Sequence, residues 1–153
     1  MTLSKAVLAF QDTLKAHRRH LHRIPEEGLI EHKTQQYLLD ALAALSPASL
    51  SSLAGTGIRA VFRGNGKGRT IAFRADMDAL PIAEENTHDY ASLHSGMMHA
   101  CGHDGHMAVL LALAACLSRH RAALQDTVVL LFQPAEESVG GARRMILEGA
   151  LQN

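Results

Sequence analysis

A continuous apolar run late in the chain most constrains the fold. Residues 127–132 (TVVLLF) place five apolar side chains in succession, a pattern typical of a strand that is covered on both faces. Residues 105–120 precede this run and predict a helix, and residues 69–75 predict an earlier strand. A strand, a helix and a buried strand in this order favour a right-handed crossover. The sequence therefore predicts an α/β fold, with a partly parallel mixed sheet flanked by helices.

The remaining elements follow from hydrophobic periodicity and turn residues. Helices are expected over residues 3–23, 31–45 and 140–147, and a strand is expected over residues 58–62. Residues 46–57 are interpreted as a turn-rich connector. The glycine-rich residues 64–68 predict a hairpin that joins strands 58–62 and 69–75. Residues 76–100 are polar and aperiodic, and loops of that length in compact domains are usually functional or mobile.

The composition excludes several classes of protein. The chain has 153 residues, enough for one domain with its own core. Lys+Arg and Asp+Glu both number 15, and no basic stripe predicts a nucleic-acid partner. No run of about 18 apolar residues exists to span a membrane. The N-terminus lacks the apolar run of a signal peptide.

The two cysteines lie in different surroundings. Cys101 belongs to a polar cluster, whereas Cys116 lies in the apolar helix, where we expect a buried and inert thiol. A disulfide between them is not expected. This usage predicts a reducing compartment and a cytoplasmic protein.

The polar cluster around Cys101 indicates metal chemistry. Residues 99–106 (HACGHDGH) hold three histidines, one cysteine and one aspartate where a loop enters a helix. A thiolate and an imidazole two residues apart can reach one cation, and zinc accepts that mixture of ligands. The alternative is a polar loop whose histidines only cap the helix.

Polar side chains also follow both predicted strands of the crossover. In open α/β sheets, ligands bind beyond the carboxyl ends of the strands. The residues expected to converge there are Asp76, Asp78, Cys101, His103, Glu136 and Glu137. This convergence predicts a metal site.

The adjacent glutamates suggest a division of roles. In extended backbone, neighbouring side chains point in opposite directions, so Glu136 and Glu137 are expected to differ in function. One would bind metal, and the other would face the substrate as a proton shuttle. Solvated loop carboxylates are the alternative for this pair, and also for Asp76 and Asp78.

Three segments carry a family resemblance. Residues 74–81 (RADMDALP), 99–106 and 132–137 (FQPAEE) resemble the signature segments of the hippurate hydrolase and indole-acetyl-amino-acid hydrolase family. These are metal-dependent amidohydrolases, related to aminoacylases and to a wider clan of dinuclear zinc peptidases. Residues 18–26 (RRHLHRIPE), followed by Glu31 and Thr34, resemble the family's opening helix and turn.

The resemblance implies a role for each matching residue. Cys101 and His103 match ligands of a two-metal centre, Glu137 matches a further ligand, and Glu136 matches the general base. Asp78 matches an aspartate that supports and orients the centre. The resemblance leaves the roles of four residues more open. Asp76 falls where many clan members carry a histidine ligand, and His106 is expected to orient rather than ligate. His20 and His22 are expected on a helix surface or at a packed helix end.

The resemblance also implies an activity and its cofactors. It implies hydrolysis of the amide bond of small-molecule N-acyl amino acids, with two divalent ions (Zn, Mn, Ni or Co) per complete site. Family members are much longer, so residues 1–153 are expected to be the N-terminal portion of a catalytic domain. The lid and dimerisation domain and two further histidine ligands would be missing, leaving weak or no activity. The alternatives are a non-catalytic metal-binding or scaffold module, and a thiol enzyme that uses Cys101 with a histidine.

Overall fold

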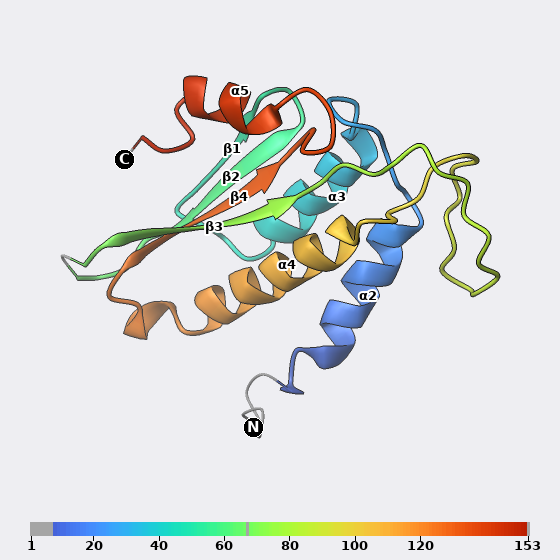
Figure 1. Cartoon of the computed structure of the whole chain (residues 1–153). Helices are drawn as coiled ribbons and strands as arrows, with labels where there is room; N and C mark the ends of the chain where they lie inside the picture. The colour runs from blue at the N-terminus through green and yellow to red at the C-terminus, as the bar shows by residue number, and fades with distance from the viewer. Residues whose placement is uncertain (1–7, 67, 153) are drawn as a thin grey trace.

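The fold is a four-stranded sheet with helices on both faces (Figure 1). The computed structural model describes residues 8–66 and 68–152. In chain order its elements are α2 (Gln11–His22), α3 (His32–Ala43), β1 (Ser49–Leu53), β2 (Gly57–Phe62), β3 (Thr70–Asp76), α4 (His103–Arg119), the short 3-10 helix η1 (Arg121–Ala123), β4 (Thr127–Gln133) and α5 (Gly141–Leu147).

The sheet is mixed, in the order β1-β2-β4-β3. β4 pairs antiparallel with β2 and parallel with β3, in a register that places Thr70 opposite Thr127 and Asp76 opposite Gln133. Helix α4 connects the two parallel strands. The α/β class and the mixed sheet flanked by helices are therefore confirmed.

The two faces of the sheet carry separate apolar cores. Helices α2, α3 and α4 cover one face, where Leu21, Leu38 and Leu111 pack against alternate residues of β2 and β4 (Figure 1). Helix α5 covers the other face, where Met145 packs near Val129. This two-sided burial explains why β4 is apolar at successive positions.

The predicted hairpin at residues 64–68 is wrong. β2 and β3 do not pair, because β4 lies between them. A Cβ atom on Gly64 or Gly68 would collide with residues Gln125 and Asp126. The glycines therefore permit a close approach of this segment to the start of β4, rather than a tight turn.

The connector predicted at residues 46–57 is also wrong. It contains β1, which forms an antiparallel hairpin with β2 and pairs Leu53 with Gly57. Ala54 and Gly55 in the loop adopt positive φ values of 51° and 82°. This edge strand is rich in serine, and exposed and half-buried residues do not alternate regularly along it. Its sequence therefore lacks the alternating pattern that indicates a strand.

The predicted helices are found, with shifted ends. Helix α2 begins at Gln11 after a turn at residues 9–10, and residues 3–7 of that prediction lie outside the described residues. Both cysteines are free, but Cys116 is half-buried rather than buried, because its side of α4 is only partly covered. Within residues 8–66 and 68–152, none of the helices has the length and apolar character needed to cross a bilayer.

Candidate metal centre

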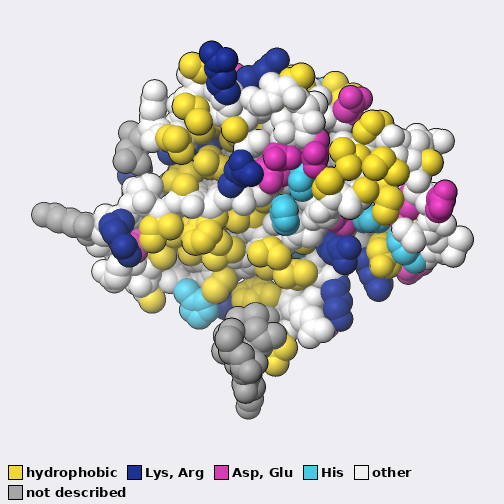
Figure 2. All heavy atoms as spheres, viewed as in Figure 1, with side chains coloured by type: hydrophobic (Ala, Val, Ile, Leu, Met, Phe, Trp, Pro, Cys, Tyr) yellow, Lys and Arg dark blue, Asp and Glu magenta, His cyan; other side chains and the backbone are white. Residues whose placement is uncertain are grey.

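Polar residues converge where β3 and β4 end and α4 begins. The amide of Met77 donates to the carbonyl of Gln133 at 2.9 Å, which continues the pairing one residue beyond β3 and carries Asp78 past the sheet edge. His103 is the first residue of α4. Acidic and histidine side chains gather on the face near the end of β3 and the start of α4 (Figure 2).

The backbone of Asp78 fixes the orientation of the His103 ring. His103 Nδ1 lies 2.9 Å from the carbonyl oxygen of Asp78. A carbonyl oxygen can only accept, so Nδ1 carries the hydrogen. The other ring nitrogen, Nε2, points toward Glu137 and lies 3.9 Å from Oε1 of that carboxylate. His103 therefore presents Nε2 toward the carboxylates, the arrangement found for imidazole ligands of metals.

The Asp78 carboxylate holds two parts of the site together. It is 1% exposed, its Oδ2 accepts from the amide of Glu137 at 2.9 Å, and its Oδ1 lies 3.3 Å from His103 Nδ1. Burial raises the pKa of Asp78, but hydrogen bonds from His103 and from the Glu137 amide outweigh burial and lower it. The hydrogen bond with Asp78 raises the pKa of His103 to about 9, against the lowering effect of burial. Asp78 is thus an ionised positioning group for both His103 and Glu137.

Glu136 and Glu137 face the same side, contrary to the expectation of opposite directions. Each has a carboxylate oxygen in a group of atoms, shared with His103, that lie within 4.8 Å of one another. The alternation rule fails because the backbone after β4 is not extended. Ala135 has a φ of 50°, and Glu136 and Glu137 lie in the following turn.

The buried carboxylate of Glu31 supports this turn through a hydrogen bond to its backbone. Glu31 is 0% exposed, and its Oε1 accepts from the amide of Ala135 at 3.0 Å. The Thr56 hydroxyl donates to its other oxygen. Gly28 approaches so closely that a Cβ atom there would lie 2.8 Å from the Cα of Ala135. The positions of Glu136 and Glu137 therefore depend on the segment between α2 and α3.

Cys101 lies beside this group but does not join it. Its side chain is exposed, and a hydrogen bond with Glu137 raises the pKa of the thiol. A raised thiol pKa disfavours the thiolate that a cysteine nucleophile needs, which argues against the thiol-enzyme alternative. Gly102, between Cys101 and His103, has a φ of 96° and turns the loop into α4.

Asp76 and His106 flank His103 on its other side. An oxygen of Asp76 lies 3.9 Å from Nδ1 of the largely exposed His106, and both residues form a second close group with His103. Asp76 also forms an ion pair with Arg74, whose Nε lies 3.2 Å from Oδ1 of Asp76.

The donor set fits a divalent metal ion. It combines an oriented imidazole, two carboxylates and a neighbouring thiol, the mixture that zinc accepts and that manganese shares in part. The buried carboxylate of Asp78 beside His103 adds negative charge that a cation would balance.

Sequence reasoning missed two buried acids that shape this region. Glu31 entered only as part of a motif, and Asp104 was not assigned a role, yet both are 0% exposed. Each stands at a helix start, where an exposed carboxylate is the ordinary expectation. The sequence signal for Asp104 was its position within the histidine cluster at residues 99–106.

The sequence profile of peptidase family M20/M25/M40 matches residues 72–153, which include every residue of the candidate centre. The chain belongs to this family. It is 50% identical over 130 residues to an N-acetyldiaminopimelate deacetylase of Brevibacillus brevis, covering 84% of this chain and 34% of the relative. It is 46% identical over 137 residues to an N-acyl-L-amino acid amidohydrolase of Geobacillus stearothermophilus, covering 89% and 37%.

Solved structures agree with the family and the fold. The YXEP protein of Bacillus subtilis, described as a dinuclear metal binding peptidase of the M20 family, superposes with a TM-score of 0.88 at 39% identity, covering 95% of this chain and 41% of that one. The aminobenzoyl-glutamate utilization protein of Klebsiella pneumoniae gives a TM-score of 0.75 at 25% identity, covering 95% and 42%. The chain spans about a third of the length of the curated relatives it matches.

Proposed function

We propose that this chain carries part of the active site of a metal-dependent amidohydrolase that acts on N-acyl amino acids, in the hippurate hydrolase and indole-acetyl-amino-acid hydrolase group. One observation supports this most: His103, Glu136 and Glu137, which come from two segments more than thirty residues apart, present their ligand atoms within 4.8 Å of one another. The names of the two curated relatives support the substrate class.

In this proposal His103, Glu137 and Cys101 hold divalent metal, and Asp78 orients the first two. A bound ion of this kind polarises the amide carbonyl and lowers the pKa of water at the site. The B. subtilis relative is described as dinuclear, and we propose two ions (Zn, Mn, Ni or Co) per complete site. The thiol of Cys101 would deprotonate on binding, since thiolate is the ligand form.

Glu136 acts as the general base. It is exposed beside His103, whereas Glu137 is tied through its amide to Asp78. From this position the Glu136 carboxylate can take a proton from the attacking water and pass it to the leaving amino group. The substrate is then cleaved into a carboxylic acid and a free amino acid.

We further propose that residues 1–153 correspond to the N-terminal portion of the catalytic domain in the longer relatives. The remaining ligands, the substrate-recognising groups and the lid and dimerisation domain would come from elsewhere in the whole protein. A cysteine ligand requires a reduced thiol, which is consistent with a cytoplasmic location.

The test compares Glu136→Gln with Glu137→Gln in a form of the protein that hydrolyses N-acetyl or N-benzoyl amino acids. Glu136→Gln should retain metal and lose about 10²- to 10⁴-fold in kcat. Glu137→Gln should lose metal as well. A Glu136→Gln enzyme with near-normal turnover would place the base elsewhere, and loss of metal in that variant would make Glu136 a ligand.

A further inference from the structure

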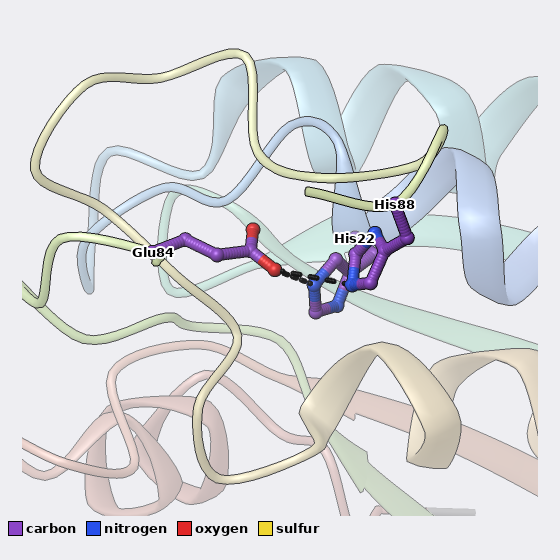
Figure 3. Close-up of side chains that lie close together, drawn as sticks. All are labelled: His22, Glu84 and His88. Carbon is purple, nitrogen blue, oxygen red and sulfur yellow. Dashed lines mark hydrogen bonds and ion pairs between the residues drawn. The ribbon is translucent and has the colours of Figure 1, made fainter. Parts of the chain in front are cut away.

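A second group of metal-binding side chains lies between the end of α2 and the long loop at residues 77–102. Glu84 Oε1 lies 3.1 Å from Nε2 of His22 and 3.3 Å from Nε2 of His88 (Figure 3). His22 is the last residue of α2, and the other two residues belong to the loop. None of the three takes part in the centre formed by Cys101, His103 and Glu137.

The distances from Glu84 Oε1 to the two Nε2 atoms match those within a coordination shell. With metal–ligand bonds of about 2.0 to 2.1 Å and tetrahedral angles, neighbouring ligand atoms lie roughly 3.3 to 3.4 Å apart. The two separations around Glu84 Oε1 are close to this value. Two imidazoles and one carboxylate are a ligand set that zinc accepts.

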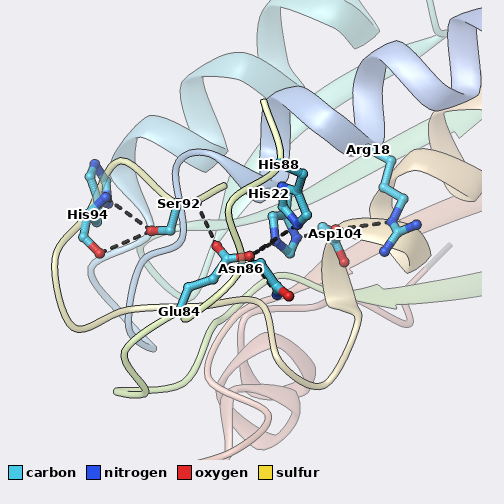
Figure 4. Close-up of polar contacts among 8 residues, drawn as sticks. All are labelled: Arg18, His22, Glu84, Asn86, His88, Ser92, His94 and Asp104. Atoms are coloured by element: carbon cyan, nitrogen blue, oxygen red, sulfur yellow. Dashed lines mark hydrogen bonds and ion pairs between the residues drawn. The ribbon is translucent and has the colours of Figure 1, made fainter. Parts of the chain in front are cut away.

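Surrounding groups orient the ligands. Nδ1 of His22 lies 2.8 Å from Oδ2 of Asp104, an oxygen that also accepts from Nε of Arg18 at 3.2 Å (Figure 4). His22 therefore donates through Nδ1 and directs Nε2 at Glu84, in the carboxylate–histidine pattern that supports zinc ligands. The amide of Ser92 donates to the second oxygen of Glu84 at 2.6 Å and fixes that carboxylate.

Hydrogen bonding accounts for His22, which lies between the carboxylates of Asp104 and Glu84, but not for every polar atom of the cluster. His88 Nδ1 is buried and has no partner among the described residues. A cation shared by the two Nε2 atoms and Glu84 Oε1 would link all three side chains at one point and balance the negative charge of Glu84. The His88 side chain is 29% exposed, so the cluster is open to solvent.

We propose that His22, Glu84 and His88 bind a divalent cation of the zinc class, separate from the centre at Cys101 and His103. The ion joins α2 to the loop between β3 and α4. Since this loop also contains Cys101, the ion stabilises the approach to the first centre.

The experiment measures zinc in a chain whose first centre has been weakened by Cys101→Ser and Glu137→Gln. Competition with a chromogenic chelator gives the affinity and stoichiometry, and the absorption of bound Co²⁺ reports tetrahedral coordination. The test variants are His22→Ala, Glu84→Gln and His88→Ala, and the control is His120→Ala, an exposed histidine at the end of α4. Far-UV circular dichroism checks that each variant is folded, and His88→Ala, in the loop, tests the site if His22→Ala does not fold.

The proposal expects one zinc ion per chain in the weakened background and in His120→Ala. The ligand variants should bind at least 10-fold more weakly and lose the tetrahedral Co²⁺ spectrum. The proposal is overturned if the background binds no zinc, or if folded His88→Ala and Glu84→Gln bind it as tightly as the control. The second result would identify the ion as adventitious.

Discussion

The carbonyl oxygen of Asp78 lies 2.9 Å from Nδ1 of His103, and the carboxylate of the same residue lies 3.3 Å from that nitrogen. One residue just beyond the end of β3 thus sets both the tautomer and the charge environment of a ring at the start of α4. The Asp78 carboxylate also holds the amide of Glu137. The candidate centre is therefore shaped by a positioning residue rather than by its ligands alone.

Replacing Asp78 tests this positioning role. Asp78→Asn keeps the backbone carbonyl and the side-chain shape, but removes the charge that faces His103. Zinc affinity should fall about 10- to 100-fold, as for other groups that orient metal ligands. Chelator competition measures it, and Asp89→Asn, an exposed aspartate of the same loop, is the control. Equal zinc affinities in the two variants would remove Asp78 from the account.

Cys101 is predicted to be a metal ligand although its thiol pKa is raised in the metal-free protein. Cys101→Ala should weaken binding of zinc or manganese, because a thiolate donor is lost. Cys116→Ala, on the half-buried side of α4, should leave the affinity unchanged. Isothermal titration compares the two variants. A Cys101→Ala chain that binds as tightly as Cys116→Ala would exclude a thiolate ligand.

Gly28→Ala should disturb the turn that carries Glu136 and Glu137. The added Cβ would lie 2.8 Å from atoms of Ala135 and Ser138, so the turn must move. Overpacking of this kind costs about 1 to 3 kcal/mol, measured by urea unfolding, and zinc affinity should fall with it. Gly105→Ala is the matched control, since its Cβ meets no heavy atom within 4 Å and α4 favours alanine over glycine. Equal stabilities of the two variants would show that the Gly28 contact is not tight.

Glu31 should make stability depend on pH. Burial raises the pKa of Glu31 above its usual 4.5, so the folded state favours the protonated acid more than the unfolded state does. The resulting stabilisation is complete below about pH 4.5 and declines as the pH rises through the raised value. Glu31→Gln should lose this dependence, and should cost about 1 to 3 kcal/mol near neutral pH because one of two buried donors loses its acceptor. Urea unfolding across this pH range measures both effects, and parallel pH profiles for the two proteins would contradict the assignment.

Local sequence patterns predicted the helices and strands well, but they predicted less well which strands pair in the sheet. The run at residues 127–132 identified a central strand, because burial on both faces leaves a signal in one segment. The pairing of β2 was mispredicted, since the glycines at 64 and 68 suit a turn and a close backbone approach equally well. Which of these applies depends on β4, sixty residues later in the chain.

The sequence predicted which segments converge, but not their geometry. The histidine–cysteine cluster and the strand ends pointed to His103, Glu136 and Glu137, which the fold brings together, and the metal-binding roles of these residues stay predictions. The positive φ of Ala135, which turns both glutamates to one side, depends on the distant Glu31 and Gly28. Likewise, His22 and Asp104 are 82 positions apart in the sequence and join two helices. No local sequence pattern indicates this pairing.

Anomalous diffraction at the zinc edge, from crystals of the chain grown with zinc, tests the central claim most directly. The account predicts an anomalous peak within bonding distance of His103 Nε2 and the Glu137 carboxylate, with the Cys101 sulfur turned toward it. It predicts that this peak is lost in crystals of His103→Ala. A zinc-loaded wild-type crystal with no peak at these three residues would contradict the metal centre.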